Sequence, residues 1–431
     1  MSEHQDRMSA RERLLLTLTG IPTAAGREDR VIMFIERWVA DRPPLRVSRD
    51  TTGNLWIAAT APGSERPATR EGVSHGSDAR ATGGGRVAPI VFEAHLDHPA
   101  FVIRDVMSQR EVWAEFRGGV KTPYFERAAA MHHGVDGRGV RGHVLETIEP
   151  DEKAGRFFRR ARLEFEEDIA AGARDIVTWD LPAPRIEDGR LRAPVCDDLA
   201  AVAAALSALE ELALVSRSAH GSESDAPEAA EVRVLLTRAE EVGFVGAIAA
   251  CTSGAIPAGS RIIALENSRS FAESPIGAGP IVRVGDRLSV FSPGLTAAVA
   301  KVAQRLAGRA DQPVGSAESA MGSTGFRWQR KLMPGGACEA SAFCAFGYEA
   351  TCVCLPLGNY HNMGRLDETE RALAAGEPAG AARIEPEEIS VADFHHLVDL
   401  LVACGRGVSA VEPLTARLER MYSERAFVLD D

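Results

Sequence analysis

Two patterns of apolar residues recur along this chain. Four short runs are almost continuously apolar, at 88–94, 232–237, 262–265 and 350–355. Such runs are typical of strands in a parallel sheet whose two faces are both covered. Apolar residues at helical spacing occur at 199–214, 293–307 and 391–403, and an Ala-rich stretch ends near Cys251. Strands that alternate with helices predict an α/β fold, with a mostly parallel or mixed sheet flanked by helices.

The first 60 residues add two elements to this plan. Residues 10–40 show helical spacing on both sides of a Gly-Ile-Pro break at 20–22. Residues 46–57 predict a hairpin, because the turn-forming residues at 50–54 separate two short apolar pieces.

The segment 104–191 has a different character from its surroundings. It consists of short alternating pieces separated by Gly, Pro and charged turns, without a long amphipathic helix. We therefore predict a small inserted β-rich domain at 104–191 and a discontinuous main α/β domain at 1–103 and 192–431. Segments 61–87, 216–230 and 371–382 are poor in large apolar residues and predict loops, with 61–87 a mobile one.

Composition and charge exclude several classes of partner. The net charge of −12 argues against a nucleic-acid-binding or membrane-surface protein, since both need a basic face. No apolar run approaches the length of a transmembrane helix, and the charged N-terminus lacks the apolar core of a signal peptide. The seven cysteines contain no Cys-x-x-Cys spacing. We expect a cytoplasmic protein with free, mostly buried thiols.

Chemically active residues follow the apolar runs. Three runs lead into His95, the Glu240–Glu241 pair and Glu266, and His361 lies a few residues beyond the fourth. In open α/β sheets, ligands bind outside the carboxyl ends of the strands. Two imidazoles with several carboxylates suit two divalent cations better than a structural zinc site, which prefers Cys and His.

Each of these residues also has an ordinary structural interpretation. An Asp-Asp pair before a helix, such as Asp197–Asp198, is usually a helix N-cap. A single His at a strand end is more often structural, and a Glu-Glu pair is more often solvated. The pairs His132–His133 and His395–His396 lack nearby acids at strand ends, so we interpret both as structural. The sequence contains no zincin helix motif, no nucleophile elbow and no Walker-type phosphate loop, which argues against those enzyme classes.

Taken in order, the motifs resemble those of the tetrahedral (glutamyl or deblocking type) aminopeptidase family of dinuclear metallopeptidases. The family segment Glu-Glu-Val-Gly-x-x-Gly-Ala matches in full at 240–247, and Gly-x-Gly-Pro matches at 277–280. Looser matches lie at 50–55, 94–101, 197–201 and 359–362. The resemblance covers most of the chain, and it includes an inserted β domain between the first His and the bridging Asp.

The resemblance implies a set of metal ligands. Asp197 would bridge two divalent metal ions. His95 and Glu266 would complete one metal site, while Glu241 and His361 would complete the other. Zinc is the expected metal, although an oxygen-rich ligand set also accepts cobalt or manganese.

The resemblance also implies an activity. The enzyme would hydrolyse N-terminal residues from peptides by means of a metal-bridging water, with Glu240 as the general base. Asp97 would be the second carboxylate of the catalytic machinery and would orient the ring of His95. The inserted domain would serve as a lid or oligomerisation element of a homo-oligomer, either a dimer or a larger assembly.

Departures from the family pattern lie beside the ligands. The family's Asp is Glu266 here, its Arg and Glu are Leu199 and His98, and its last Arg and Ser are Asn359 and Asn362. These changes suggest an altered substrate pocket. They motivate an alternative, a metal-dependent amidohydrolase or deacylase that cleaves N-acyl amino acids or other amides. A third possibility is a catalytically degenerate member that acts as a binding or scaffold protein.

Overall fold

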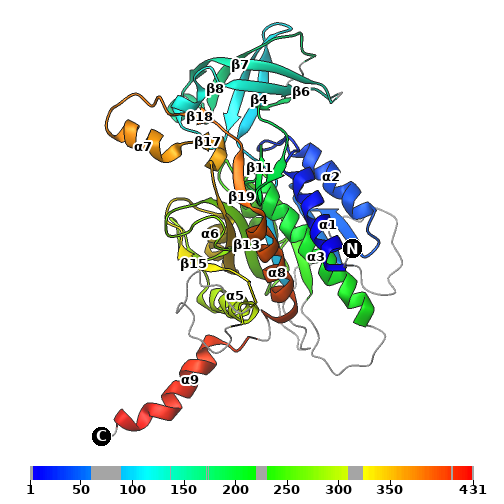
Figure 1. Cartoon of the computed structure of the whole chain (residues 1–431), viewed down its shortest axis with the longest axis vertical. Coiled ribbons are helices and arrows are strands. Elements are labelled where there is room, and N and C mark those ends of the chain that lie inside the picture. Colours follow the sequence, from blue (N-terminus) through cyan, green and yellow to red (C-terminus); the bar gives the residue numbers. More distant parts are fainter. Residues whose placement is uncertain are drawn as a thin grey trace.

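The computed structural model describes residues 3–59, 89–135, 137–170, 172, 174–219, 231–308, 324–408 and 411–429. An eight-stranded mixed sheet crosses the main body in the order β1-β2-β12-β3-β13-β16-β14-β15. Helices cover both of its faces (Figure 1). The strands of this sheet are β1 (Leu45–Arg49), β2 (Leu55–Ala59), β3 (Ile90–His95), β12 (Val232–Thr237), β13 (Arg261–Arg269), β14 (Ile281–Gly285), β15 (Gln329–Leu332) and β16 (Glu349–Leu357). The predicted α/β sheet with flanking helices is confirmed.

The central strands β12, β3, β13 and β16 are parallel neighbours. Their alternate residues pack against opposite helical layers, which is why both sets are apolar. Ile90, Phe92 and Ala94 belong to the larger core cluster, whereas Val91 belongs to a smaller cluster on the other face. The outer pairs β1–β2, β2–β12 and β14–β16 are antiparallel.

Two helical layers enclose the sheet. One layer consists of α1 (Glu3–Leu18), α2 (Asp29–Ala40), α3 (Leu199–Ala219), α5 (Pro293–Leu306) and α8 (Val391–Gly407). The other consists of α4 (Val245–Ser253) and α6 (Glu339–Ala345). The first half of α3 is fully buried from Leu199 to Leu206. Its alanines provide little side-chain volume, so α3 packs closely between the sheet and α8.

A closed six-stranded barrel lies beside this body, in the order β4-β5-β8-β7-β6-β9 (top of Figure 1). Four aromatic rings meet edge to face or at a tilt in its centre, with centroids 4.8–6.1 Å apart: Phe101, Phe116, Phe125 and Trp179. The barrel strands are β4 (Ala100–Val106), β5 (Glu111–Arg117), β6 (Ala129–His133), β7 (Gly139–Ile148), β8 (Arg159–Phe165) and β9 (Ile176–Trp179). The domain boundaries 104–191 stay a prediction.

Three smaller strands connect the chain after the barrel to the main body. β10 (Arg185–Glu187) and β11 (Arg190–Ala193) form a hairpin, and β11 pairs with β19 (Glu387–Ser390). This pairing places the end of β11, and therefore the following Asp197, next to the chain that precedes α8. Near the barrel, β17 (Met363–Gly364) pairs with β18 (Arg383–Ile384), and α7 (Leu366–Ala374) lies between them in the chain.

Parts of two predicted loops are helical. Helix α3 continues to Ala219, so the loop predicted at 216–230 is wrong for its first four residues. Helix α7 covers residues 371–374 of the loop predicted at 371–382, because Leu366 and Thr369 anchor that helix by burial. Residues 61–87, predicted to be a mobile loop, lie outside the described residues, as do 220–230.

The predicted state of the thiols is confirmed. All seven cysteines are free, and five of them are buried. None of the helices in the described ranges has the length and hydropathy needed to span a bilayer.

Candidate active site

The sheet topology brings the chemically active residues together. The neighbouring strands β12, β3, β13 and β16 are parallel, so their carboxyl ends lie at one edge of the sheet. His95 is the last residue of β3, and the Glu240–Glu241 pair follows β12. His361 lies in the 3₁₀ turn η3 (Tyr360–Asn362), directly after β16. Glu266, expected at a strand end, lies within β13, because β13 and β16 stay paired as far as Arg269.

Asp197 lies between the two histidines. Its Oδ1 is 3.3 Å from Nε2 of His95, and its Oδ2 is 3.5 Å from Nε2 of His361. Glu266 and Glu240 each approach Nε2 of His95 to 3.8 Å, and Glu241 approaches Nε2 of His361 to 3.1 Å. The cluster therefore has two halves that share Asp197.

Both imidazoles are oriented by main-chain oxygens. Nδ1 of His95 lies 3.1 Å from the carbonyl oxygen of Asp97, and Nδ1 of His361 lies 2.8 Å from that of Gly119. A carbonyl only accepts hydrogen bonds, so each Nδ1 carries a proton and donates it. In the neutral ring, Nε2 then keeps a free lone pair directed at the carboxylates, which is the arrangement of a metal-ligating histidine.

The donor set fits divalent cations. Asp197 Oδ1 and Glu241 Oε1 are buried and accept no hydrogen bond. Burial raises the pKa of Glu266 to about 7, with a further contribution from the charge of Asp197. Burial also raises the pKa of Glu240 well above its usual range, and the charges of Glu266 and Glu241 add to the shift. Without a cation this cluster is strained electrostatically, and a cation in each half would relieve the repulsion.

The Glu240–Glu241 turn is built by residues distant in sequence. Main-chain N–H groups of Glu240 and Glu241 donate to the two carboxylate oxygens of Asp97, at 2.9 and 3.1 Å. The Asp97 carboxylate is 3.6 Å from Nδ1 of His95, so its main contacts are with this turn. Its predicted role in orienting the His95 ring stays a prediction, and in this structure the Asp97 carbonyl receives that hydrogen bond.

The glycine of the Glu-Glu motif has a steric explanation. A Cβ at Gly246 would lie 2.5 Å from both the N and the O of Arg238. Asn54, in the turn before β2, accepts from Arg238 N and donates to the Gly246 carbonyl. The glycine therefore lets α4 begin directly against the strand that delivers the two glutamates.

Glu387, which the sequence did not indicate, binds two segments of the site, at Asp197 and at His361. Its Oε2 accepts hydrogen bonds from Cys196 N and Asp197 N at 2.7 and 2.9 Å, and its Oε1 accepts one from His361 N at 2.8 Å. Burial raises the pKa of Glu387 to about 7. The residue lies on β19 among other acids, so no local pattern distinguishes it.

Asp198 and Asn267 are two further residues beyond the predicted set. Asp198 lies within ligand distance of His95, Asp197 and Glu266. However, its oxygens accept hydrogen bonds from His95 N at 3.2 Å and from Asn267 Nδ2 at 2.8 Å. These contacts indicate a positioning residue for β3, and they replace the helix N-cap interpretation of the Asp-Asp pair.

Two departures from the family pattern contact each other. His98 Nε2 lies 3.1 Å from Asn362 Oδ1, and His98 Nδ1 lies 2.5 Å from the carbonyl oxygen of Asp197. Asn362 also donates to the Pro194 carbonyl. The His98–Asn362 pair thus contacts the main chain at Pro194 and at Asp197, and it helps to hold this segment in place.

The other histidine pairs are elsewhere. His132 and His133 lie on β6 in the barrel, where burial lowers the pKa of His133 to about 4. His395, in α8, contacts Glu12 of α1. Within the described ranges, neither pair belongs to a group of three or more potential metal ligands.

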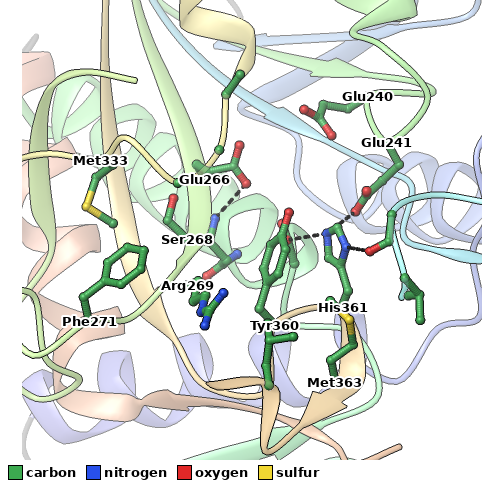
Figure 2. A pocket seen from close by; sticks show the side chains of 18 of the residues that line it. Glu240, Glu241, Glu266, Ser268, Arg269, Phe271, Met333, Tyr360, His361 and Met363 are labelled. Carbon is green, nitrogen blue, oxygen red and sulfur yellow. Dashed lines mark hydrogen bonds and ion pairs between the residues drawn. The ribbon is translucent and has the colours of Figure 1, made fainter. Parts of the chain in front are cut away.

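A cavity of about 430 Å³ opens beside the cluster. Figure 2 shows Glu240, Glu241 and His361 on one side of it and Glu266 on the other, with the ring of Tyr360 between them. Tyr360 stacks on His361 with centroids 3.7 Å apart. The remaining wall includes Phe271, Met333 and Met363, and residues 119–121 of the barrel. The volume and the mixed lining are typical of a site for a small ligand or peptide end.

Sequence comparison identifies the family of this chain. The profile of the M42 glutamyl aminopeptidases matches residues 79–307, which is more than half of the chain. The chain belongs to the M42 glutamyl aminopeptidase family. It is therefore a peptide-bond hydrolase, and the resemblance inferred from the motifs is confirmed. M42 peptidases are metal-dependent, and this chain holds a His/Asp/Glu cluster that could bind metal.

Solved structures of M42-type enzymes share the fold. TET1 peptidase of Pyrococcus horikoshii has a TM-score of 0.62 at 17% identity, covering 93% of this chain and 99% of its own. Aminopeptidase APDkam598 of Desulfurococcus kamchatkensis gives 0.63 at 16% identity, covering 93% and 95%. A TET aminopeptidase from a marine sediment archaeon of the Thaumarchaeota gives 0.63 at 15% identity, covering 93% and 96%. A search of curated proteins finds no match.

Two buried carboxyl side chains, Glu93 and Glu339, lie next to the cluster of proposed metal ligands. The Thr237 hydroxyl contacts Glu339 Oε2 at 2.6 Å and Glu93 Oε1 at 3.0 Å, and Thr237 is paired with His95 across β12 and β3. A hydroxyl has one proton, so it donates to one carboxyl group and must accept from the other. Burial raises the pKa of Glu93 to about 8 and that of Glu339 well above its usual range. One of the two groups is therefore a neutral acid, and we assign the proton to Glu339, because the charge of Glu93 raises its pKa further.

This arrangement predicts different outcomes for two substitutions of Glu339. Glu339→Gln keeps a neutral side chain of the same shape that donates to Thr237, so the free energy of unfolding should change by less than about 1 kcal/mol. Glu339→Leu removes the donor and leaves Glu93 poorly solvated, which should cost about 1–3 kcal/mol. Urea unfolding followed by circular dichroism measures both values. Equal stability of the two variants would contradict the assignment.

Proposed function

We propose that this protein is a dinuclear metal-dependent aminopeptidase that removes N-terminal residues from peptides. The observation that carries this proposal is the pair of half-sites that share Asp197. His95 and Glu266 would complete one half, and Glu241 and His361 the other. Zinc is the expected metal, and cobalt or manganese would also suit the ligand set. Two bound cations would supply positive charge that lowers the pKa of a water molecule between them.

Glu240 is assigned the role of general base. Its side chain lies 3.8 Å from Nε2 of His95, and it groups with His95 and Glu241 but not with Asp197, the residue that the two half-sites share. Its main-chain N–H is fixed by Asp97, so the carboxylate is positioned beside the cavity. Burial first, and the neighbouring carboxylates second, raise its pKa. A carboxylate with a raised pKa accepts a proton readily and can then donate it to the leaving amine.

Glu240→Gln tests this division of roles. We expect the variant to keep the metal content of the unaltered enzyme, since Glu240 is not a proposed ligand. Its kcat should fall by roughly three orders of magnitude or more, because amide groups do not accept the proton. Metal analysis and hydrolysis of aminoacyl substrates are the measurements. Near-normal turnover would refute the base assignment, and loss of metal would show that Glu240 is a ligand. Glu241→Gln is the matched comparison and should lose metal.

The cavity also favours a class of N-terminal residue. Lys121 and Arg269 pair with Glu370 at its rim, at 3.2 and 2.9 Å. Arg283 lines the cavity and is only 2% exposed, and the charge of Glu266 is near enough to raise its pKa. Its Nη1 donates to Ser268 Oγ at 3.0 Å, and its Nε has no partner. The charge of Glu266 balances part of this buried cation, and the unpartnered Nε leaves a hydrogen-bond position for an acidic substrate side chain.

Arg283→Met tests this preference. The kcat/KM for a glutamyl substrate should fall about 10- to 100-fold relative to that for a leucyl substrate, as expected for loss of a charged hydrogen bond. The ratio within one variant is the informative quantity, because partial unfolding lowers both values equally. An unchanged ratio would show that Arg283 only neutralises its surroundings.

The second candidate is a deacylase with the same metal site. It is motivated by His98 and Asn362, two residues that differ from the family pattern and contact each other next to the main chain of Asp197. A panel of aminoacyl and N-acyl substrates separates the two functions. Exclusive cleavage of N-acylated compounds would overturn the aminopeptidase proposal, and absence of both activities and of bound metal would favour a degenerate binding protein.

Assembly into a homo-oligomer is part of the proposal. The P. horikoshii TET1 peptidase can assemble into a tetrahedron or a large octahedral shell. We assign to the barrel of this chain a lid function, because its residues 119–121 line the cavity and Gly119 orients His361. A cytoplasmic location, with peptides as substrates, completes the proposed setting.

A further inference from the structure

Among the described residues, the C-terminal helix α9 (Leu414–Arg425) packs mainly against the short turn that follows it. With the following 3₁₀ turn η5 (Ala426–Leu429), it extends away from the main body (Figure 1). Every residue from Arg417 to Arg425 is exposed. An isolated helix of about 12 residues is marginal in water, because its few hydrogen bonds barely offset the cost of nucleation. Such a helix is stable when its apolar side chains are covered.

α9 carries an apolar stripe. Leu418, Met421 and Tyr422 follow the i, i+3, i+4 spacing of one helix face, and they are 41–67% exposed. Val428 and Leu429 continue the exposed apolar surface in η5. Contiguous apolar surface of this kind marks an interaction site.

The charges beside the stripe are self-complementary. Arg417 and Glu424 lie seven positions apart, so they occupy the same flank of the stripe two turns apart. In a parallel pair of α9 helices this flank would face the opposite flank of the second copy, so Arg417 and Glu424 would not meet. Antiparallel pairing around a twofold axis places each Arg417 opposite the Glu424 of the second copy, and it does so twice.

We propose that α9 pairs antiparallel with α9 of a second copy of this chain. Five apolar side chains on each copy, at roughly 100 Å² apiece, bury about 1,000 Å² in total. This area reaches the lower bound of specific protein interfaces. The contact is separate from the proposed active site and does not depend on the proposed enzymatic activity.

The first test removes the apolar surface from the full chain. In sedimentation equilibrium, Leu418→Glu/Met421→Glu should weaken self-association at least tenfold, or lower the assembly mass to one half if other contacts also operate. Both residues are exposed, so far-UV circular dichroism of the body should be unchanged. An unaltered mass, or an unaltered chain that is monomeric at about 100 μM and therefore has a Kd above that concentration, would overturn the proposal.

The second test uses the charges and fixes the orientation. Arg417→Glu and Glu424→Arg should each weaken association, because each places like charges together twice. The double variant Arg417→Glu/Glu424→Arg should restore it, since the swapped charges match again. Arg420→Glu is the control: Arg420 pairs with Glu412 of its own chain, away from the stripe. Failure of the double variant to recover, or equal weakening by the control, would overturn antiparallel pairing.

Discussion

Repulsion among buried carboxylates is the constraint on which this structure depends. Asp197, Glu240, Glu241 and Glu266 converge at the carboxyl edge of four parallel strands. Their burial raises the pKa of Glu240 and Glu266, which measures how unfavourable their joint ionisation is. Cations in the two halves around Asp197 would turn this repulsion into attraction, and the two histidines already present Nε2 toward those positions.

The support around the cluster consists of further carboxylates that bind main-chain N–H groups. Asp97 holds the Glu240–Glu241 turn, and Glu387 holds both Asp197 and His361. These segments include Ala239 and His361, each with a φ of 55°, a left-handed conformation that costs about 1–2 kcal/mol in a residue with a Cβ. Charged hydrogen bonds of this kind offset that cost. The proposed ligands are therefore positioned by strained turns that distant acids hold in place.

Much of the sheet could be predicted because its strands are buried on both faces. The runs 232–237 and 262–265 were readable as strands for that reason, and the hairpin at 46–57 was readable from its turn. Prediction failed where tertiary contacts extend an element. Strand β13 passes beyond Glu266, because β16 stays paired with it as far as Arg269, and helix α3 continues beyond residue 214 to Ala219. Local composition carries no information about that neighbour.

By itself, the sequence determined the chemical types in the site and the order of its motifs, because His and acidic residues recur next to the apolar runs along the chain. Only the tertiary structure decided which oxygen faces which imidazole, and that Asp97 binds a turn through its carboxylate and a ring through its carbonyl. It also revealed Glu387, Asp198 and the Glu93–Glu339 pair. Acids far apart in the chain acquire these roles only when folding buries them beside unpaired N–H groups, and no local pattern encodes that proximity.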